Sequence, residues 1–130
     1  MQHEFIHLQE KQQQHLPHIL RELQTHGRKI NHWAWWVFPT DLAGRSEPLP
    51  KTCVQPEERS LLLNGSTAHE WQLVLEKIAS LIEQHQSWNV VLPPIDHGRV
   101  RFFIRYWSAE AERTQWLNNV LRILRENKGS

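Results

Sequence analysis

The chain has 130 residues, of which 15 are Lys or Arg and 14 are Asp or Glu, so its formal net charge is only +1. A length of this order fits one domain, and such a chain buries about two-thirds of its unfolded surface, which allows a core without disulfides. The near-balanced charge argues against a general nucleic-acid coat, because such a protein would be strongly basic. We therefore expect a single domain over residues 1–130, with nucleic acid an improbable partner.

A single cysteine, Cys53, excludes an internal disulfide and is compatible with a reducing compartment. The N-terminus lacks the charged start and apolar run of a signal peptide. No stretch approaches the roughly 18 apolar residues that a membrane span requires. These features predict a cytoplasmic protein without a membrane partner.

Residues 3–26 are predicted to form the first helix. Apolar side chains recur there with helical spacing, at Leu16, Ile19, Leu20 and Leu23. Pro17 predicts a kink or a fresh helix start near Leu16, and Gly27 occupies the place of a helix C-terminal glycine. The histidine pairs of this segment have no obvious carboxylate or cysteine companion, so we interpret them as surface residues and predict no metal site. These pairs are His3 with His7 and His15 with His18.

Residues 27–40 hold three of the seven tryptophans, two adjacent cations and a histidine. Arginine and lysine bind phosphate oxygens, and indole faces stack on bases. Arg28 and Lys29 are therefore candidate phosphate ligands, and the candidate stacking residues are Trp33, Trp35 and Trp36. The alternative is that Trp33, Trp36 and Phe38 belong to the core, with the two cations solvated at the end of the helix.

Residues 39–56 contain four prolines and are predicted to form a long loop. A nucleophilic role for Cys53 within it would need a neighbouring base, and the sequence identifies none. After this loop, Pro56 is placed to open a short helix, and Thr67 with Glu70 fits a capping box at the start of a longer one. Ser108 is predicted to cap the final helix. The predicted core positions are Trp71, Val74, Ile78, Leu81, Leu117, Val120, Leu121 and Leu124.

Residues 95–107 fit either a strand or a helix by periodicity. In the helical interpretation Asp96 is the cap, and Arg101 and Arg105 lie one turn apart. We predict a mainly α fold, a compact domain of four to five helices. The alternative is an α+β fold in which residues 88–92 and 99–106 pair as a hairpin.

The run from Gly27 to Pro39, with Gly-Arg-Lys, then His-Trp and a Phe-Pro end, resembles the signature of the uncharacterised family called domain of unknown function 1810. The acidic residue before a basic, apolar segment at residues 96–101 is similar to that family's second landmark. The proline-rich loop departs from the family's pattern and leaves a sister family open. The resemblance implies a mainly helical single domain. It also implies an association with nucleotide and ADP-ribose metabolism, while the activity of the family is not established.

Together these residues predict a pocket that binds or processes a phosphorylated small molecule, nucleotide or ADP-ribose-like, without a cofactor or metal. Phosphate would be held by Arg28, Lys29, Arg99 and Arg101. The acid–base candidates are His32, Asp96 and His97. Whether the chain is an enzyme stays open. The hypothesis requires residues 27–40 and 95–107 to meet in space. The alternative is a non-enzymatic interaction module for a protein or single-stranded nucleic acid.

Overall fold

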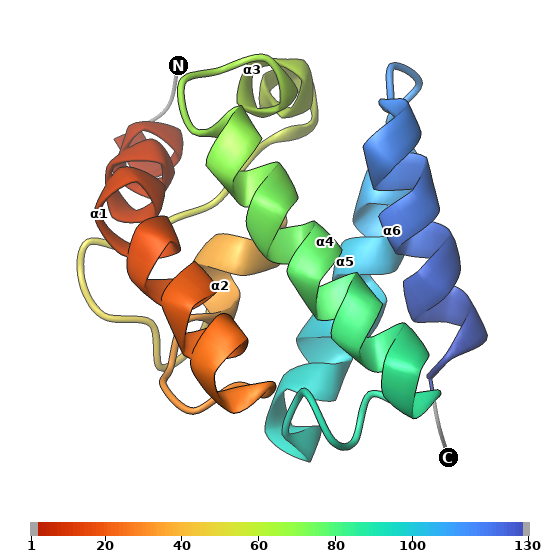
Figure 1. The fold of residues 1–130 in the computed structure, drawn as a ribbon. Coiled ribbons are helices and arrows are strands. Elements are labelled where there is room, and N and C mark those ends of the chain that lie inside the picture. The colour runs from red at the N-terminus through yellow and green to blue at the C-terminus, as the bar shows by residue number, and fades with distance from the viewer. Residues whose placement is uncertain (1–2, 129–130) are drawn as a thin grey trace.

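The computed structural model describes residues 3–128, and every regular element in that range is helical (Figure 1). The elements are α1 (His3–His26), α2 (Ala34–Val37), η1 (Pro56–Glu58), α3 (Arg59–Leu63), α4 (Ala68–His85), η2 (Pro94–Asp96), α5 (His97–Ser108) and α6 (Gln115–Glu126). The predicted mainly α fold is therefore confirmed. The alternative hairpin is wrong, because residues 88–92 form turns and bends and residues 99–106 all lie within α5.

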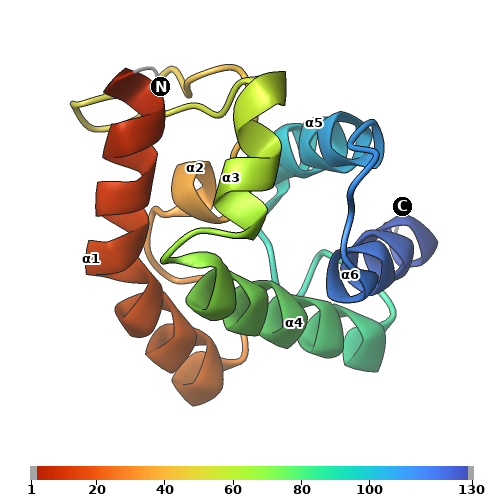
Figure 2. The ribbon, with the colours of Figure 1, turned by 90° about the horizontal axis from the view of Figure 1, so that it is seen from above.

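Helix α4 lies at the centre of the fold, between α1 on one side and α6 on the other (Figure 2). Helix α4 takes this central position because Trp71, Val74 and Ile78 form an apolar stripe on one helical face and are buried. Trp71 also donates from Nε1 to the Val37 carbonyl oxygen at 2.9 Å, which ties α4 to α2. All eight predicted core positions are buried, and side chains from all six α-helices enter one core cluster.

Helix α1 continues through Pro17 as one element of 24 residues, so the predicted fresh start near Leu16 does not occur. Leu16 and Ile19 are buried on either side of the proline. The predicted C-terminal glycine is confirmed. Gly27 has a φ of 69°, in the region that favours glycine, and its amide donates to the Leu23 carbonyl at 2.8 Å.

The predicted capping box at Thr67 is wrong. The Thr67 hydroxyl makes no cap hydrogen bond and instead donates to Oε1 of Gln12 at 2.7 Å. Gln12 is fully buried, and its Nε2 donates to the Trp36 carbonyl at 2.8 Å. A buried amide must satisfy both its oxygen and its nitrogen, and this requirement takes the threonine away from its own helix. The three residues therefore connect α4, α1 and α2.

The residues predicted to cap α5 and α6 do not cap these helices in the structure. Asp96 precedes α5 but makes no side-chain cap bond, because its carboxylate is engaged elsewhere, as described below. Ser108 ends α5, and its hydroxyl donates to the Ile104 carbonyl. Helix α6 begins later, where the Thr114 hydroxyl accepts from the Leu117 amide at 3.4 Å. Arg113 stabilises the intervening turn by donating to the Ser108 and Glu110 carbonyls.

Hydrogen bonds between its own polar groups order the long loop over residues 38–55. Glu47 is buried and accepts from the Gly44 amide at 3.2 Å and from the Thr52 hydroxyl. Lys51 donates to the Gly44 carbonyl at 2.8 Å. Cys53 is buried here as a free thiol, and burial raises its pKa, which disfavours the thiolate that a nucleophile needs. The loop therefore presents a defined surface next to α5.

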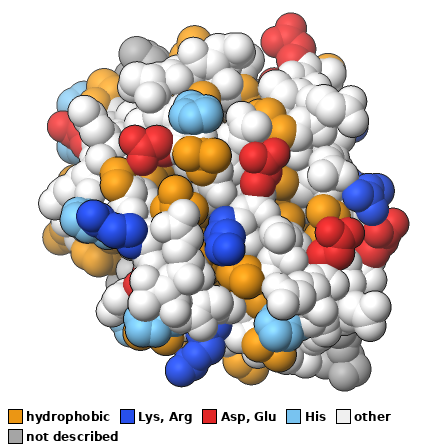
Figure 3. Space-filling view, viewed as in Figure 1, with side chains coloured by type: hydrophobic (Ala, Val, Ile, Leu, Met, Phe, Trp, Pro, Cys, Tyr) orange, Lys and Arg blue, Asp and Glu red, His pale blue; other side chains and the backbone are white. Residues whose placement is uncertain are grey.

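Within residues 3–128 no helix is both long enough and apolar enough to cross a membrane. Figure 3 shows apolar, acidic, basic and histidine side chains interspersed over the face of the molecule seen in Figure 1.

Candidate functional site

Residues 27–40 and 95–107 do meet in space. Lys29 Nζ lies 2.8 Å from Asp96 Oδ2, and the Lys29 amide donates to the Val91 carbonyl at 2.8 Å. Further along, Arg99 Nε donates to the Phe38 carbonyl at 3.0 Å. The spatial condition on which the pocket hypothesis depends is therefore met.

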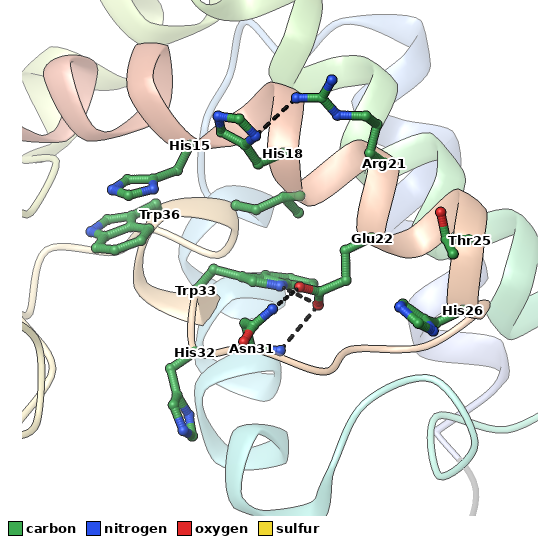
Figure 4. A pocket seen from close by; sticks show the side chains of 11 residues that line it. His15, His18, Arg21, Glu22, Thr25, His26, Asn31, His32, Trp33 and Trp36 are labelled. Atoms are coloured by element: carbon green, nitrogen blue, oxygen red, sulfur yellow. Dashed lines mark hydrogen bonds between the residues drawn. The ribbon is translucent and has the colours of Figure 1, made fainter.

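Two hollows adjoin this contact. The larger, of about 490 Å³, lies between α1 and residues 31–36, and we call it the α1 hollow (Figure 4). Its lining residues are His15, His18, Ile19, Arg21, Glu22, Thr25, His26, Asn31, His32, Trp33 and Trp36. The smaller, of about 300 Å³, we call the α5 hollow. Its lining residues are Lys29, His32, Trp33, Ala34, Trp35, Gly44, Ser46, Ile95, Asp96 and Arg99. His32 and Trp33 line both.

Glu22 organises the loop between the hollows. One carboxylate oxygen accepts from the Ile30 amide at 2.7 Å. The same oxygen accepts from the Asn31 amide at 3.1 Å and from Trp33 Nε1 at 2.8 Å, and the other oxygen accepts from Asn31 Nδ2 at 2.6 Å (Figure 4). Burial alone would raise the pKa of Glu22, but these hydrogen bonds outweigh it and leave the pKa below its ordinary value. Glu22 is therefore a fixed carboxylate with its acceptor capacity largely used.

One wall of the α1 hollow is an aromatic stack. The His15 imidazole lies parallel to the Trp36 indole, with ring centroids 4.4 Å apart and an interplanar angle of 9°. Burial lowers the pKa of His15, and the positive charge of Lys11 nearby lowers it further. A neutral imidazole is thus favoured against the indole, and together the rings offer an apolar wall.

The rim of the α1 hollow is basic and polar. Arg21 Nη2 donates to His18 Nδ1 at 2.9 Å (Figure 4). Because a guanidinium can only donate, His18 Nδ1 must accept, which leaves its Nε2 to carry the proton. Within the described chain Arg21 has no carboxylate close enough for an ion pair. Exposed His26 and His32 complete a rim able to hold an anion.

The cations of the α5 hollow already interact with other groups of the protein. The Lys29 side chain is only 5% exposed, pairs with Asp96 and lies 5.3 Å from the centroid of the Trp33 ring. Arg99 donates to the Phe38 and Leu42 carbonyls, and its remaining Nη2 is buried without a hydrogen-bond partner. Burial lowers the pKa of Arg99, although Glu47 and Asp96 oppose that effect. Arg99 Nη2 is therefore a buried donor that this hollow leaves without a protein partner.

Trp35 forms a wall of the α5 hollow through close contact with Gly44. A Cβ atom built on Gly44 would lie 2.2 Å from Trp35 Cδ1, so no larger residue fits at position 44 without moving the indole. Trp35 is partly exposed, whereas Trp33 and Trp36 are 2% and 5% exposed. The core interpretation of Trp33, Trp36 and Phe38 is confirmed by their burial.

The remaining predicted residues lie outside both hollows. Arg28 is exposed. The Nε2 of His97 lies 2.9 Å from the Leu92 carbonyl, and its ring packs 5.3 Å from that of Trp88. Arg101 lines a separate groove between α5 and α6. The predicted set is thus divided: Lys29, His32, Trp33, Trp35, Trp36, Asp96 and Arg99 line a hollow, and Arg28, His97 and Arg101 do not.

Sequence reasoning missed the contribution of α1. His15, His18, Glu22 and His26 are spaced three, four and four residues apart, which places them along one helical face toward residues 31–36. That spacing was a detectable signal. In the described part of the chain no three His, Cys, Asp or Glu side chains gather closely enough to hold a metal ion.

No family model matches the chain, and comparisons with curated proteins and with solved structures found no match. The resemblance to domain of unknown function 1810 stays a prediction.

Proposed function

We propose that the chain binds a phosphorylated small molecule, nucleotide-like or ADP-ribose-like, in the α1 hollow and its continuation past His32. The observation that supports this most directly is the composition of the α1 hollow. It combines an apolar floor of Ile19, Trp33 and Trp36 with a basic rim, and its one carboxylate, Glu22, is occupied by hydrogen bonds. A volume of about 490 Å³ also falls within the range of small-molecule sites, about 300–1,000 Å³.

In this proposal the phosphate ligands differ from those that the motif first indicated. Lys29 is neutralised by Asp96, so Arg21 and His18 take the phosphate at the α1 rim. The floor of the hollow receives the base or sugar. Because His32 and Trp33 line both hollows, a two-part ligand would continue into the α5 hollow, toward Arg99 Nη2.

The proposal is for binding. Processing would fall to His32, the candidate acid–base group that faces both hollows without a hydrogen bond that would hold its ring. Asp96 is paired with Lys29, and His97 is held by the Leu92 carbonyl. We place the protein in the cytoplasm, since the unpaired thiol of Cys53 suits a reducing compartment.

A thermal-shift screen against NAD, ADP-ribose, mononucleotides and cyclic nucleotides tests the proposal. A ligand at 100 times its dissociation constant stabilises the folded state by about 2.7 kcal/mol, a shift easily measured. Arg21→Gln combined with His32→Ala should remove most of that shift, whereas Arg122→Gln on α6 is the matched surface control. Arg99→Ala is a poor probe, because it removes bonds to two backbone carbonyls. A hit that Arg21→Gln with His32→Ala leaves unchanged contradicts the site, and a screen without hits contradicts the proposal.

A second candidate function is a protein-interaction module, supported by apolar side chains at the edge of the α5 hollow. Ile95 is 88% exposed and Leu42 is 59% exposed, and both adjoin Arg99. Ile95→Asp should abolish capture of a partner in a pull-down while leaving small-molecule shifts intact. Single-stranded nucleic acid is the weaker version, and steep loss of binding with salt is its expected signature.

A further inference from the structure

A third depression, of about 410 Å³, lies between α5 and α6 and shares no lining residue with the two hollows. Its lining residues are Arg101, Ile104, Arg105, Ser108, Arg125 and Lys128. Four of the six are cations and none is acidic. In a chain of net charge +1 this is a local excess of positive charge. We call it the basic groove.

The cations of the basic groove lack the acidic neighbours that normally accompany a solvated helix face. Such neighbours lie three or four residues away along a helix. None of the four has Asp or Glu at those spacings, and within the described chain none forms an ion pair. On the same helix Arg122 does have such a partner, Glu126, at 2.9 Å. The groove is therefore charged without internal compensation.

Local contacts place two of these cations, Arg125 and Arg105. Arg125 donates to the Ser108 hydroxyl, which itself donates to the Ile104 carbonyl, so the Arg125 guanidinium is held beside α5. The Arg105 guanidinium lies 5.6 Å from the centroid of the Phe102 ring. Positions 101, 105 and 108 are successive turns of one helix face. At 1.5 Å per residue they cover about 10 Å, longer than one phosphate group.

We propose that the basic groove binds an acidic segment of a partner protein, with successive carboxylates along the guanidinium groups of Arg101, Arg105 and Arg125. Arginine binds carboxylates through two parallel hydrogen bonds, which suits a row of them. A nucleic-acid strand fits less well, because the groove has no aromatic lining residue on which a base could stack and the chain is nearly neutral. The proposal is independent of ligand binding at the α1 and α5 hollows.

The test uses fluorescence anisotropy with a labelled oligoglutamate peptide, a labelled single-stranded oligonucleotide and inorganic tripolyphosphate as competitor. The wild-type chain should bind the peptide most tightly, and affinity should fall as salt is added, because these charges are exposed. Arg101→Gln with Arg105→Gln should weaken peptide binding by at least about tenfold, which is 1.4 kcal/mol. The matched control, Lys77→Gln with Arg122→Gln, changes net charge equally outside the groove and should alter affinity less than about twofold.

Arg125→Gln with Lys128→Gln repeats the test from α6, so that failure of one variant to fold does not decide the outcome. The proposal is overturned if groove and control variants lose affinity equally, because the attraction is then one of net charge. It is also overturned if the oligonucleotide binds more tightly than the peptide, if tripolyphosphate displaces the peptide at equimolar concentration, or if the wild-type chain binds none of the probes.

Discussion

Trp33 Nε1 donates to Glu22 Oε2 at 2.8 Å, and this bond joins the tryptophan motif to the helix that precedes it. The same oxygen accepts from the Ile30 and Asn31 amides. One side chain of α1 therefore sets the course of the loop that separates the two hollows.

Glu22→Ala should destabilise the fold by about 1–3 kcal/mol, because hydrogen bonds to a charged acceptor are worth more than neutral ones, and two backbone and two side-chain donors would lose their partner. Urea-induced unfolding measures the loss. Glu22→Gln should cost less, since its carbonyl oxygen still accepts. Glu83→Ala on the exposed part of α4 is the control, and an equal effect of Glu83→Ala and Glu22→Ala would contradict the role of Glu22.

The lowered pKa of Glu22 predicts a pH dependence with a definite sign. Between its folded and unfolded pKa values the unfolded chain binds more protons. The contribution of Glu22 to stability is therefore fully present above the unfolded pKa and is lost as pH falls through the folded one. The difference in unfolding free energy between wild type and Glu22→Gln should be constant near neutral pH and shrink on acidification below about pH 4.5. A difference that grows on acidification contradicts the assignment.

Gly44→Ala should destabilise the protein by about 1–3 kcal/mol, because the new methyl group has to displace the Trp35 indole. Gly98→Ala is the matched control. A Cβ there meets nothing within 4 Å, and alanine is the better helix former within α5, so that variant should gain up to about 1 kcal/mol. Opposite signs for the two variants in thermal or urea unfolding are the expected result. Equal signs would mean that Trp35 moves freely.

Thr67→Val should cost about 1–2 kcal/mol, because the buried Gln12 oxygen would lose its donor. Gln12→Leu should cost more, since it also frees the Trp36 carbonyl. The double variant should cost less than the sum of the two, because the residues share one network. Additive losses in urea unfolding would show that the hydrogen bond between Thr67 and Gln12 does not contribute.

The helices could be predicted because their signals are local. The stripe from Trp71 to Ile82 and the Gly27 end of α1 need only spacing and one residue's conformational freedom. The cap at Thr67 was predicted wrongly for the opposite reason. The Thr67 hydroxyl bonds to a residue 55 positions away, and a long-range partner leaves no periodic trace in the sequence.

The candidate site likewise has features that the sequence predicts and contacts that it does not. The aromatic and basic residues of the motif were visible in the sequence, but the pairing of Lys29 with Asp96 and the hydrogen bond from Arg99 to the Phe38 carbonyl depend on how distant segments pack. That packing decides which cations remain available to a ligand. It engages Lys29 and leaves Arg21 unpaired, and no spacing rule distinguishes the two.

Burial of the indoles has an optical consequence. Of the seven tryptophans, Trp35 and Trp116 are partly exposed and the other five are buried. Buried indoles emit at shorter wavelength and resist collisional quenchers, so the folded chain should respond to acrylamide mainly through these two side chains. Since Trp35 borders the α5 hollow and Trp116 lies on α6, Trp116→Phe would leave a chain whose quenchable emission reports on the hollow without an added label.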